Sequence, residues 1–291
     1  MLGVLAALVI VIGFAIKNKL IFHPNNEAYD HPSNYGLKHD EFWTEIKSGL
    51  KVRVWRVHSP HPEGARTAII LQGNSGNVSL MTTRMVMLAH MGLTVLSADY
   101  PGYGQNEGSP TEEGTYQTAE ALWTLALEGG AKPEDILIFG FSIGGGVAGY
   151  LAEAHPPAAL VLDSTFTRLS DVPAIHLPLW GPYARLILGD AFDTKTRLAN
   201  IRCPLLVIHS PEDEIVPYVL GEDLFNTYQN NYKDMAVGVG DHVGFILNAP
   251  LYREKIARLL VTAGLLTEAQ AEPRPGSWPL MPKTRPERDP H

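Results

Sequence analysis

The chain has 291 residues, of which 45% are hydrophobic and 19% are charged, and its formal net charge at pH 7 is −8. This balance is typical of a globular protein and excludes the composition of intrinsic disorder, and the lack of clustered Lys and Arg excludes a nucleic-acid partner. The single cysteine, Cys203, cannot form a disulfide within the chain, so nothing indicates an oxidising compartment. The length suits one α/β domain with short appendages.

The N-terminus carries an uninterrupted apolar run at residues 2–16, followed by Lys17, Lys19 and a second apolar patch at 20–22. A membrane span needs about 20 apolar residues, so the run suffices only if the lysines reach back to the interface. We interpret it as an uncleaved single-pass anchor, whose C-terminal lysines place the remaining chain on the cytoplasmic face. The alternative is a signal peptide cleaved near residues 13–15, which would give a secreted or periplasmic protein.

Apolar runs bounded by Gly, Pro and Asp alternate with helix-like stretches from about residue 40 to residue 260. This rhythm predicts a mostly parallel eight-stranded sheet that opens with an antiparallel hairpin. The predicted strands are 40–46, 52–58, 67–72, 93–98, 136–141, 159–162, 204–209 and 235–239. The predicted helices are 80–90, 112–127, 144–154, 218–228 and 251–263. In such sheets the functional side chains gather outside the carboxyl ends of the strands.

A glycine-rich loop, LQGNSGN, follows the third predicted strand. Backbone N–H groups in such a loop can stabilise negative charge, and we predict that the N–H of Asn74 forms half of an oxyanion hole. The structural alternative is a plain turn before a helix capped by Asn77 or Ser79.

Residues 140–144 read GFSIG and match the G-x-S-x-G nucleophile elbow, with a strand before and a helix after. The flanking glycines permit the strained turn that lifts the hydroxyl of Ser142 above the sheet. The structural alternative is a serine that only caps the next helix. If Ser142 is the nucleophile, the N–H of Ile143 completes the oxyanion hole with Asn74.

A serine nucleophile requires a base and an acid, which in this kind of sheet follow in the order Ser, Asp or Glu, His. The turn SPEDEIVP after strand 204–209 carries Asp213, and the glycine-rich loop after the last strand carries His242. The sequence therefore predicts Ser142, Asp213 and His242 as a catalytic triad.

Several residues compete for the acid and base roles. Glu212 and Glu214 share the turn with Asp213, and Asp163 ends strand 159–162, where it can serve instead as a hydrogen-bond acceptor for the following segment. His209 ends a strand, and we interpret it as a structural histidine.

The same stretch contains a second motif. Gly144, Gly146 and Gly149 spell G-x-G-x-x-G, and Asp163 follows about 20 residues later, as in dinucleotide-binding proteins. Two residues separate the strand from the first glycine, however, and the unit lies in the middle of the chain. This interpretation also leaves the loop that carries His242 unexplained.

The segment 166–188 is too irregular for a simple crossover helix, and we expect a cap over the site within about 164–200. Its apolar side chains either line an acyl pocket or form a merely structural insert. The residues in question are Ile175, Leu177, Leu179 and Trp180.

With these residues placed, the chain resembles the α/β-hydrolase fold family, and within it the membrane-anchored serine hydrolases of the Bem-like and α/β-hydrolase-domain type. The resemblance covers about residues 20–260 through six ordered motifs: LIFHP, LQGNSGN, DYPGYGQNEGSPTEEG, GFSIGG, HSPEDEIVP and GDHVGF. It implies an α/β-hydrolase fold, with Ser142 as nucleophile, Asp213 as acid and His242 as base. Two positions depart from the family pattern, because Gln72 replaces the usual His and Ser210 the usual Gly.

The domain organisation that we expect is an anchor or signal segment at 1–22, a hydrolase domain at 23–265 and a disordered proline-rich tail at 266–291. The expected function is hydrolysis of a carboxylic ester or thioester in a small acyl or lipid-like substrate through an acyl-enzyme, with no metal and no organic cofactor. The alternative from another class is a membrane-tethered scaffold that binds without catalysis.

Overall fold

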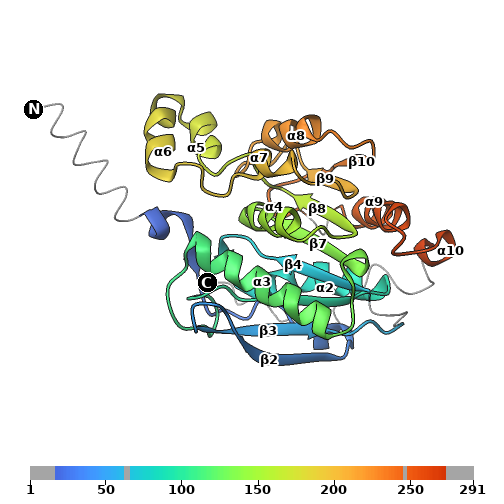
Figure 1. Ribbon diagram of the computed structural model, residues 1–291. Coiled ribbons are helices and arrows are strands. Elements are labelled where there is room, and N and C mark those ends of the chain that lie inside the picture. The colour runs from blue at the N-terminus through green and yellow to red at the C-terminus, as the bar shows by residue number, and fades with distance from the viewer. Residues whose placement is uncertain (1–16, 62–65, 245–247, 273–291) are drawn as a thin grey trace, which may run out of the picture.

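The computed structural model describes residues 17–61, 66–244 and 248–272. An eight-stranded sheet crosses the molecule, with helices on both faces (Figure 1). Its strands lie in the order β10-β9-β8-β7-β4-β6-β3-β2. Their bounds are β2 His39–Glu45, β3 Lys51–Val57, β4 Thr67–Leu71, β6 Thr94–Ala98, β7 Ile136–Phe141, β8 Ala159–Asp163, β9 Leu205–His209 and β10 Lys233–Val237.

The six strands from β10 to β6 are parallel, whereas β3 pairs antiparallel with both β6 and β2. Strands β4, β7, β8 and β9 are buried along their whole length, as their nearly continuous apolar sequences require for strands covered on both faces. The hairpin between β2 and β3 turns at Gly49, which has a φ of 82°. The prediction of a mostly parallel eight-stranded sheet with an opening hairpin is confirmed.

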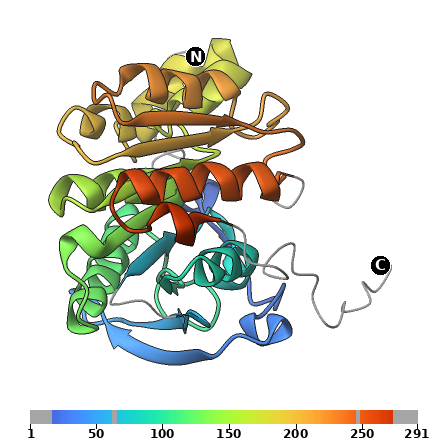
Figure 2. The same cartoon turned by 90° about the vertical axis from the view of Figure 1, so that its right-hand side faces the viewer.

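The five predicted helices are present, with ends that shift by one or two residues. A 3₁₀ turn, η2 Val78–Met81, replaces the predicted first turn of α2. Helices α3, α4 and α8 cover one face of the sheet, and α2 and α9 cover the other (Figures 1 and 2). Their bounds are α2 Thr82–His90, α3 Glu112–Glu128, α4 Ile143–Ala154, α8 Tyr218–Thr227 and α9 Ala249–Thr262.

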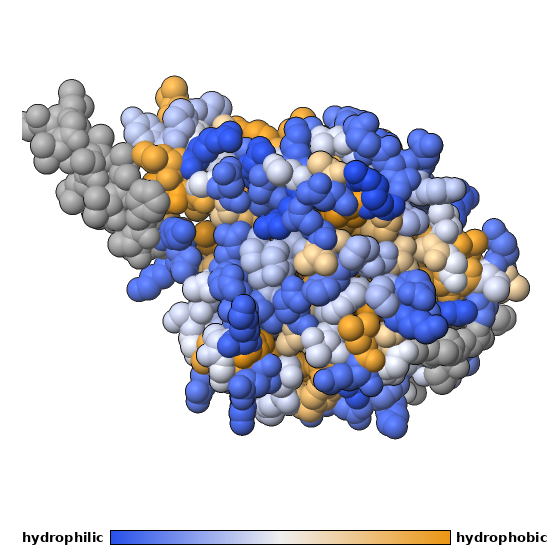
Figure 3. All heavy atoms as spheres, viewed as in Figure 1, coloured by the Kyte–Doolittle hydropathy of each residue, from blue (hydrophilic) through white to orange (hydrophobic). Residues whose placement is uncertain are grey.

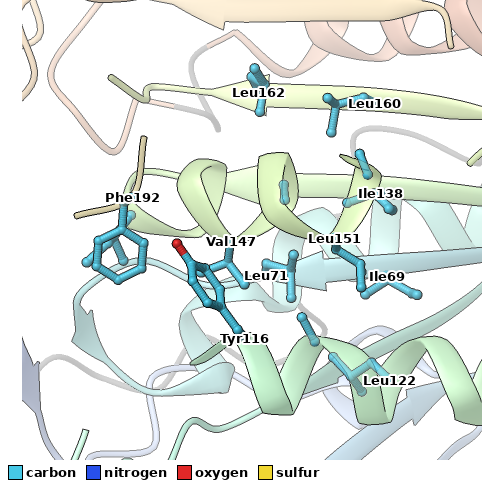
Figure 4. Close-up of a cluster of buried hydrophobic side chains, with 14 of the residues drawn as sticks. Ile69, Leu71, Tyr116, Leu122, Ile138, Val147, Leu151, Leu160, Leu162 and Phe192 are labelled. Carbon is cyan, nitrogen blue, oxygen red and sulfur yellow. The ribbon is translucent and has the colours of Figure 1, made fainter. Parts of the chain in front are cut away.

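The alternation of side chains along each strand divides the core into two apolar layers. In β4, Ile69 and Leu71 point into the layer under α3 and α4, while Ala68 and Ile70 point into the layer under α2 and α9. Figure 4 shows the first layer, in which Leu122 of α3 and Val147 of α4 meet side chains of the sheet. The two layers cover the central strands on both faces. The carboxyl ends of these strands hold the candidate site.

Four short helical elements follow β8, and α5 and α6 lie at the end of the molecule where the N-terminal segment enters (Figure 1). Gly181 brings α5 and α6 together, since a Cβ there would lie 3.2 Å from the Cβ of Ala174. The elements are α5 Asp171–His176, η4 Pro178–Trp180, α6 Gly181–Leu188 and α7 Thr194–Leu198.

Of the two alternatives for the apolar cap residues, lining of an acyl pocket or a merely structural insert, the structure favours the second for three of the four. Ile175, Leu177 and Leu179 are 42%, 57% and 89% exposed, because the close contact between α5 and α6 leaves these side chains on the outside. The side chain of Trp180 lies outside the part of the structure that is described.

Residues just outside both predicted domain boundaries pack against the fold. Ile21 and Phe22 are buried in the core, and the short strand β1 His23–Pro24 pairs with β5 Ser75–Gly76, so the domain begins before residue 23. At the other end Leu266 is buried, and a capping box at Thr267 starts the helix α10 Glu268–Ala271.

The apolar run at 2–16 and the tail from 273 onward lie outside the described residues. Within residues 17–61, 66–244 and 248–272, no helix combines the length and the apolar content that a bilayer crossing needs.

Candidate active site

Ser142 occupies a strained turn between β7 and α4, with φ 54° and ψ −123°. A non-glycine residue in such a conformation costs about 1–3 kcal/mol, so the surroundings must hold it in place. The N–H of Ser142 donates to the carbonyl of Asp163 (2.9 Å), and its own carbonyl accepts from the Gly145 N–H (2.9 Å) and the Thr165 hydroxyl (2.6 Å). Ser142 is thus held as an elbow, with no side-chain cap hydrogen bond to its helix.

The glycines around Ser142 are required by close backbone packing. A Cβ at Gly144 would lie 2.1 Å from the carbonyl oxygen of Leu71 and 2.6 Å from that of Gln72, and one at Gly146 would lie 2.5 Å from the Cβ of Phe192. The absence of a side chain at Gly144 lets the start of α4 lie against the end of β4, and that at Gly146 leaves room for Phe192. The first two glycines of the G-x-G-x-x-G pattern, Gly144 and Gly146, are therefore explained by close packing.

The structure brings the three predicted triad residues together at the carboxyl edge of the sheet. His242 Nε2 lies 3.0 Å from Ser142 Oγ, and His242 Nδ1 lies 2.8 Å from Asp213 Oδ2. Because the carboxylate is an acceptor, Nδ1 carries the proton of the neutral ring, and Nε2 is free to accept from the serine hydroxyl. Ser142 is buried, with 5% of its surface exposed.

Asp213 is a fully buried carboxylate with hydrogen-bond donors at both oxygens. Its Oδ1 accepts from the backbone N–H groups of Ile215 (3.0 Å) and Val216 (2.8 Å), and its Oδ2 faces His242 and His209. Burial raises the pKa of Asp213, but the hydrogen bonds from His209 and His242 outweigh it and hold the pKa well below the usual carboxyl range. Asp213 therefore remains ionised at neutral pH.

His209 contacts Asp213, a contact that the sequence did not predict. Its ring is fully buried, with Nε2 2.8 Å from the carbonyl oxygen of Val216 and 3.3 Å from Asp213 Oδ2. Gly221 provides room for the ring, since a Cβ there would lie 2.2 Å from His209 Nδ1. The one sequence signal was its place at the end of a strand four residues before Asp213.

The competing carboxylates are engaged elsewhere. Asp163 pairs with Arg84 in a buried ion pair, with Oδ2 2.8 Å from Nη2 and 3.0 Å from Nε. Glu212 accepts from the backbone N–H of Gly240 at 2.7 Å and so supports the loop of His242, while Glu214 is exposed. Asp213 alone of the four candidates contacts the histidine.

The predicted oxyanion loop is tied to two other segments. The carbonyl of Asn74 accepts from the His23 N–H (2.8 Å) and the Tyr103 hydroxyl (2.7 Å), and its side-chain amide donates to the carbonyl of Ile21 (3.0 Å). In the part of the chain that the structure describes, the backbone N–H groups of Asn74 and Ile143 have no protein acceptor. Both can therefore donate to a bound ligand, and their role as an oxyanion hole stays a prediction.

Asp99 links the DYPGYG loop to the segment behind the oxyanion loop. Its Oδ1 accepts from the Val78 N–H at 2.7 Å, and Gly104 approaches so closely that a Cβ there would lie 2.3 Å from Oδ2. Burial raises the pKa of Asp99 to about 6, although the Val78 hydrogen bond and the charge of Arg53 oppose the shift.

A serine, a histidine and an aspartate within hydrogen-bond distance, at the carboxyl edge of this sheet, define the class of the α/β hydrolases. The sequence model described as alpha/beta hydrolase fold matches residues 69–194. The chain is also 34% identical over 269 residues to the Mycobacterium tuberculosis protein Rv2307c, across 91% of this chain and 94% of that protein. The chain therefore belongs to the α/β-hydrolase fold family.

Two further similarities come from proteins with named activities. The lysophosphatidylserine lipase ABHD12 of Danio rerio is 28% identical over 279 residues, across 78% of this chain and 70% of that protein. The structure of the Pyrococcus furiosus esterase Pf2001 superposes with a TM-score of 0.68 at 17% identity, over 82% of this chain and 98% of that one. At this identity the second similarity shows the fold alone, and the predicted fold is confirmed.

Proposed function

We propose that this α/β hydrolase is a serine hydrolase that cleaves carboxylic ester or thioester bonds through an acyl-enzyme. The observation that carries the proposal is His242, which bridges Ser142 and the ionised Asp213 at 3.0 and 2.8 Å. A serine hydroxyl is a weak nucleophile until a base removes its proton, and this arrangement supplies the base and holds it in the required tautomer.

The reaction follows from this geometry. His242 Nε2 takes the Ser142 proton as Oγ attacks the substrate carbonyl, and Asp213 stabilises the imidazolium that forms. The N–H groups of Asn74 and Ile143 stabilise the negative oxygen of the tetrahedral intermediate. His242 then protonates the departing alcohol or thiol. Water, deprotonated by the same ring, releases the acid and restores the serine.

The substrate that we propose is an acyl or lipid-like molecule. The lipase named among the relatives and the apolar sequence at 2–16 support this class. We also propose that residues 2–16 anchor the chain in a membrane, with the catalytic domain on the cytoplasmic face, as in the Bem-like type. Membrane fractionation with protease protection of the intact cell tests this, and recovery of the chain in the periplasm or medium would favour a cleaved signal instead.

The first experiment is labelling of the full chain by a fluorophosphonate probe, which reacts with activated serines. The parent should label, whereas Ser142→Ala and His242→Ala should not, and hydrolysis of model esters should fall about 10⁵-fold or more in each. A Ser164→Ala variant is the matched control, since Ser164 is also a buried serine with positive φ but lies outside the triad. A folded parent that does not label would overturn the proposal in favour of the binding scaffold.

A further inference from the structure

The cap exposes several apolar side chains to solvent, which we call the cap face (Figure 3). Leu179, Tyr183 and Leu186 follow the spacing of a single helical side, and Leu179 is 89% exposed. Single exposed apolar residues are ordinary, whereas several on one short segment indicate an interaction surface. The cap face consists of Ile175, Leu177, Leu179, Tyr183 and Leu186.

The end of α6, the helix that carries Tyr183 and Leu186 of the cap face, lies against the first described residues of the chain. Lys17 and Phe22 line a cavity of about 440 Å³ together with Leu188 and Phe192, so the first described residues lie against the end of the cap. Leu20, which is 59% exposed, adds to this apolar end.

Both signs of charge lie at this end, since Glu112 and Glu113 line the same cavity as Lys17. Lys17 and Lys19 directly follow the apolar sequence, and Arg185 extends from α6 with a side chain that is 63% exposed. Asp190, 4.0 Å from Arg185, offsets part of that charge. Basic residues beside an exposed apolar helix side are the pattern of segments that lie in the interface of a bilayer.

We propose that the cap face rests in the headgroup region of the same phospholipid bilayer that receives residues 2–16. The proposal rests on the proposed function, because it explains how an acyl substrate reaches the serine. His176 of α5 lies 3.0 Å, through Nε2, from the carbonyl oxygen of Ile215, two residues after the triad acid. A cap seated on the bilayer therefore places the loop of Asp213 beside the surface in which acyl chains are dissolved.

The test uses the full chain in vesicles of phosphatidylcholine and phosphatidylglycerol, with a polarity-sensitive fluorophore on an introduced thiol. The Leu179→Cys variant carries it on the cap face, and Leu127→Cys, at a 41% exposed leucine of α3, is the matched control. Burial raises the pKa of Cys203 to about 12, so the native thiol labels slowly at neutral pH. Quenchers attached to the lipid chains should reduce the fluorescence of the label at position 179 several-fold more than that of the label at position 127.

Equal quenching at the two positions would overturn the proposal. A blue-shifted signal at 179 that lipid quenchers leave unchanged would overturn it too, because the cap face would then be covered by protein, either residues 2–16 or a second copy. Fluorophosphonate labelling of the same samples separates the two hypotheses. Lipid quenching without labelling would leave the cap proposal standing while the serine hydrolase mechanism fails.

A second comparison measures the consequence for turnover. Leu186→Asp should reduce hydrolysis of a long-chain ester dissolved in the vesicles about tenfold, because it places a charge in the interface. Hydrolysis of a water-soluble short-chain ester should not change. Leu127→Asp, the matched control, should leave both rates as they are, and equal loss of both substrates in Leu186→Asp would contradict the proposal.

Discussion

At the residue scale, the proposed triad acid, Asp213, is contacted on one carboxylate oxygen by backbone N–H groups and on the other by two histidine rings. Asp213 receives two backbone N–H groups on one oxygen, and His242 and His209 on the other. A carboxylate satisfied in this way stays charged although it is buried, and its orientation toward His242 is set by partners that do not touch the nucleophile. We therefore propose His209 as a positioning residue.

The replacement His209→Phe tests this role, because it keeps a ring in the cavity and removes the donor to Asp213. We expect kcat to fall about tenfold with KM nearly unchanged, since one hydrogen bond to a charged group contributes about 1.5–3 kcal/mol. Steady-state kinetics on a soluble ester measure the split. Tyr218→Phe, next to the His209 ring at a centroid distance of 5.8 Å, is the control and should retain parental kinetics. A parallel rise in KM would argue against positioning.

At the element scale, the position of the nucleophile depends on how closely α4 approaches β4. The start of the helix rests on the carbonyls of Leu71 and Gln72, the same segment that leads into the oxyanion loop. The same contact between α4 and the end of β4 therefore fixes both the strained turn at Ser142 and the position of the predicted oxyanion loop. The buried pair of Arg84 and Asp163 adds a link between α2 and the end of β8.

The variant Gly144→Ala should therefore lose activity at least about a hundredfold, because the new methyl group must push α4 away from two carbonyl oxygens. Gly149→Ala on the same helix is the control. Its Cβ would lie 3.3 Å from a methyl group of Thr194, and alanine favours helix by about 1 kcal/mol over glycine. Circular dichroism and ester hydrolysis of both variants check this, and full activity in Gly144→Ala would refute the close-packing argument.

At the scale of the whole molecule, stability should depend on pH through the buried carboxyl of Asp99. Its pKa is about 6 in the folded chain, above the ordinary value of 3.8, so the folded state binds the proton more tightly than the unfolded state. The free energy of unfolding therefore falls as pH rises from about 4 to about 6. The full loss is of the order of 3 kcal/mol.

Asp99→Asn removes the titration while keeping an oxygen that accepts from Val78. Relative to the parent, this variant should gain up to about 3 kcal/mol at pH 8 and nothing at pH 4. Denaturant unfolding at the two pH values measures the difference. Asp190→Asn, at a carboxyl that is 74% exposed, should show no such trend. A variant that is no more stable at pH 8 than the parent would contradict the assignment.

The parts of the fold that the sequence predicted are those that local patterns encode. Continuous apolar strands, a G-x-S-x-G turn and loops at strand ends were sufficient for the sheet, the main helices and the positions of Ser142, Asp213 and His242, because periodicity and turn chemistry act over short distances. Parallel topology then brings the carboxyl ends of strands to one edge, so residues 100 positions apart meet without any long-range signal.

The remaining features depended on contacts between segments that no local pattern relates. The burial of Ile21 and Phe22, the ion pair of Arg84 with Asp163 and the outward direction of the cap leucines arise only once the chain is folded. The same holds for His209 at the acid, since its orientation is set by Val216 and the space above Gly221. The sequence by itself determined the main elements and singled out the proposed triad residues, while the tertiary structure decided their partners, because those partners are selected by packing in space.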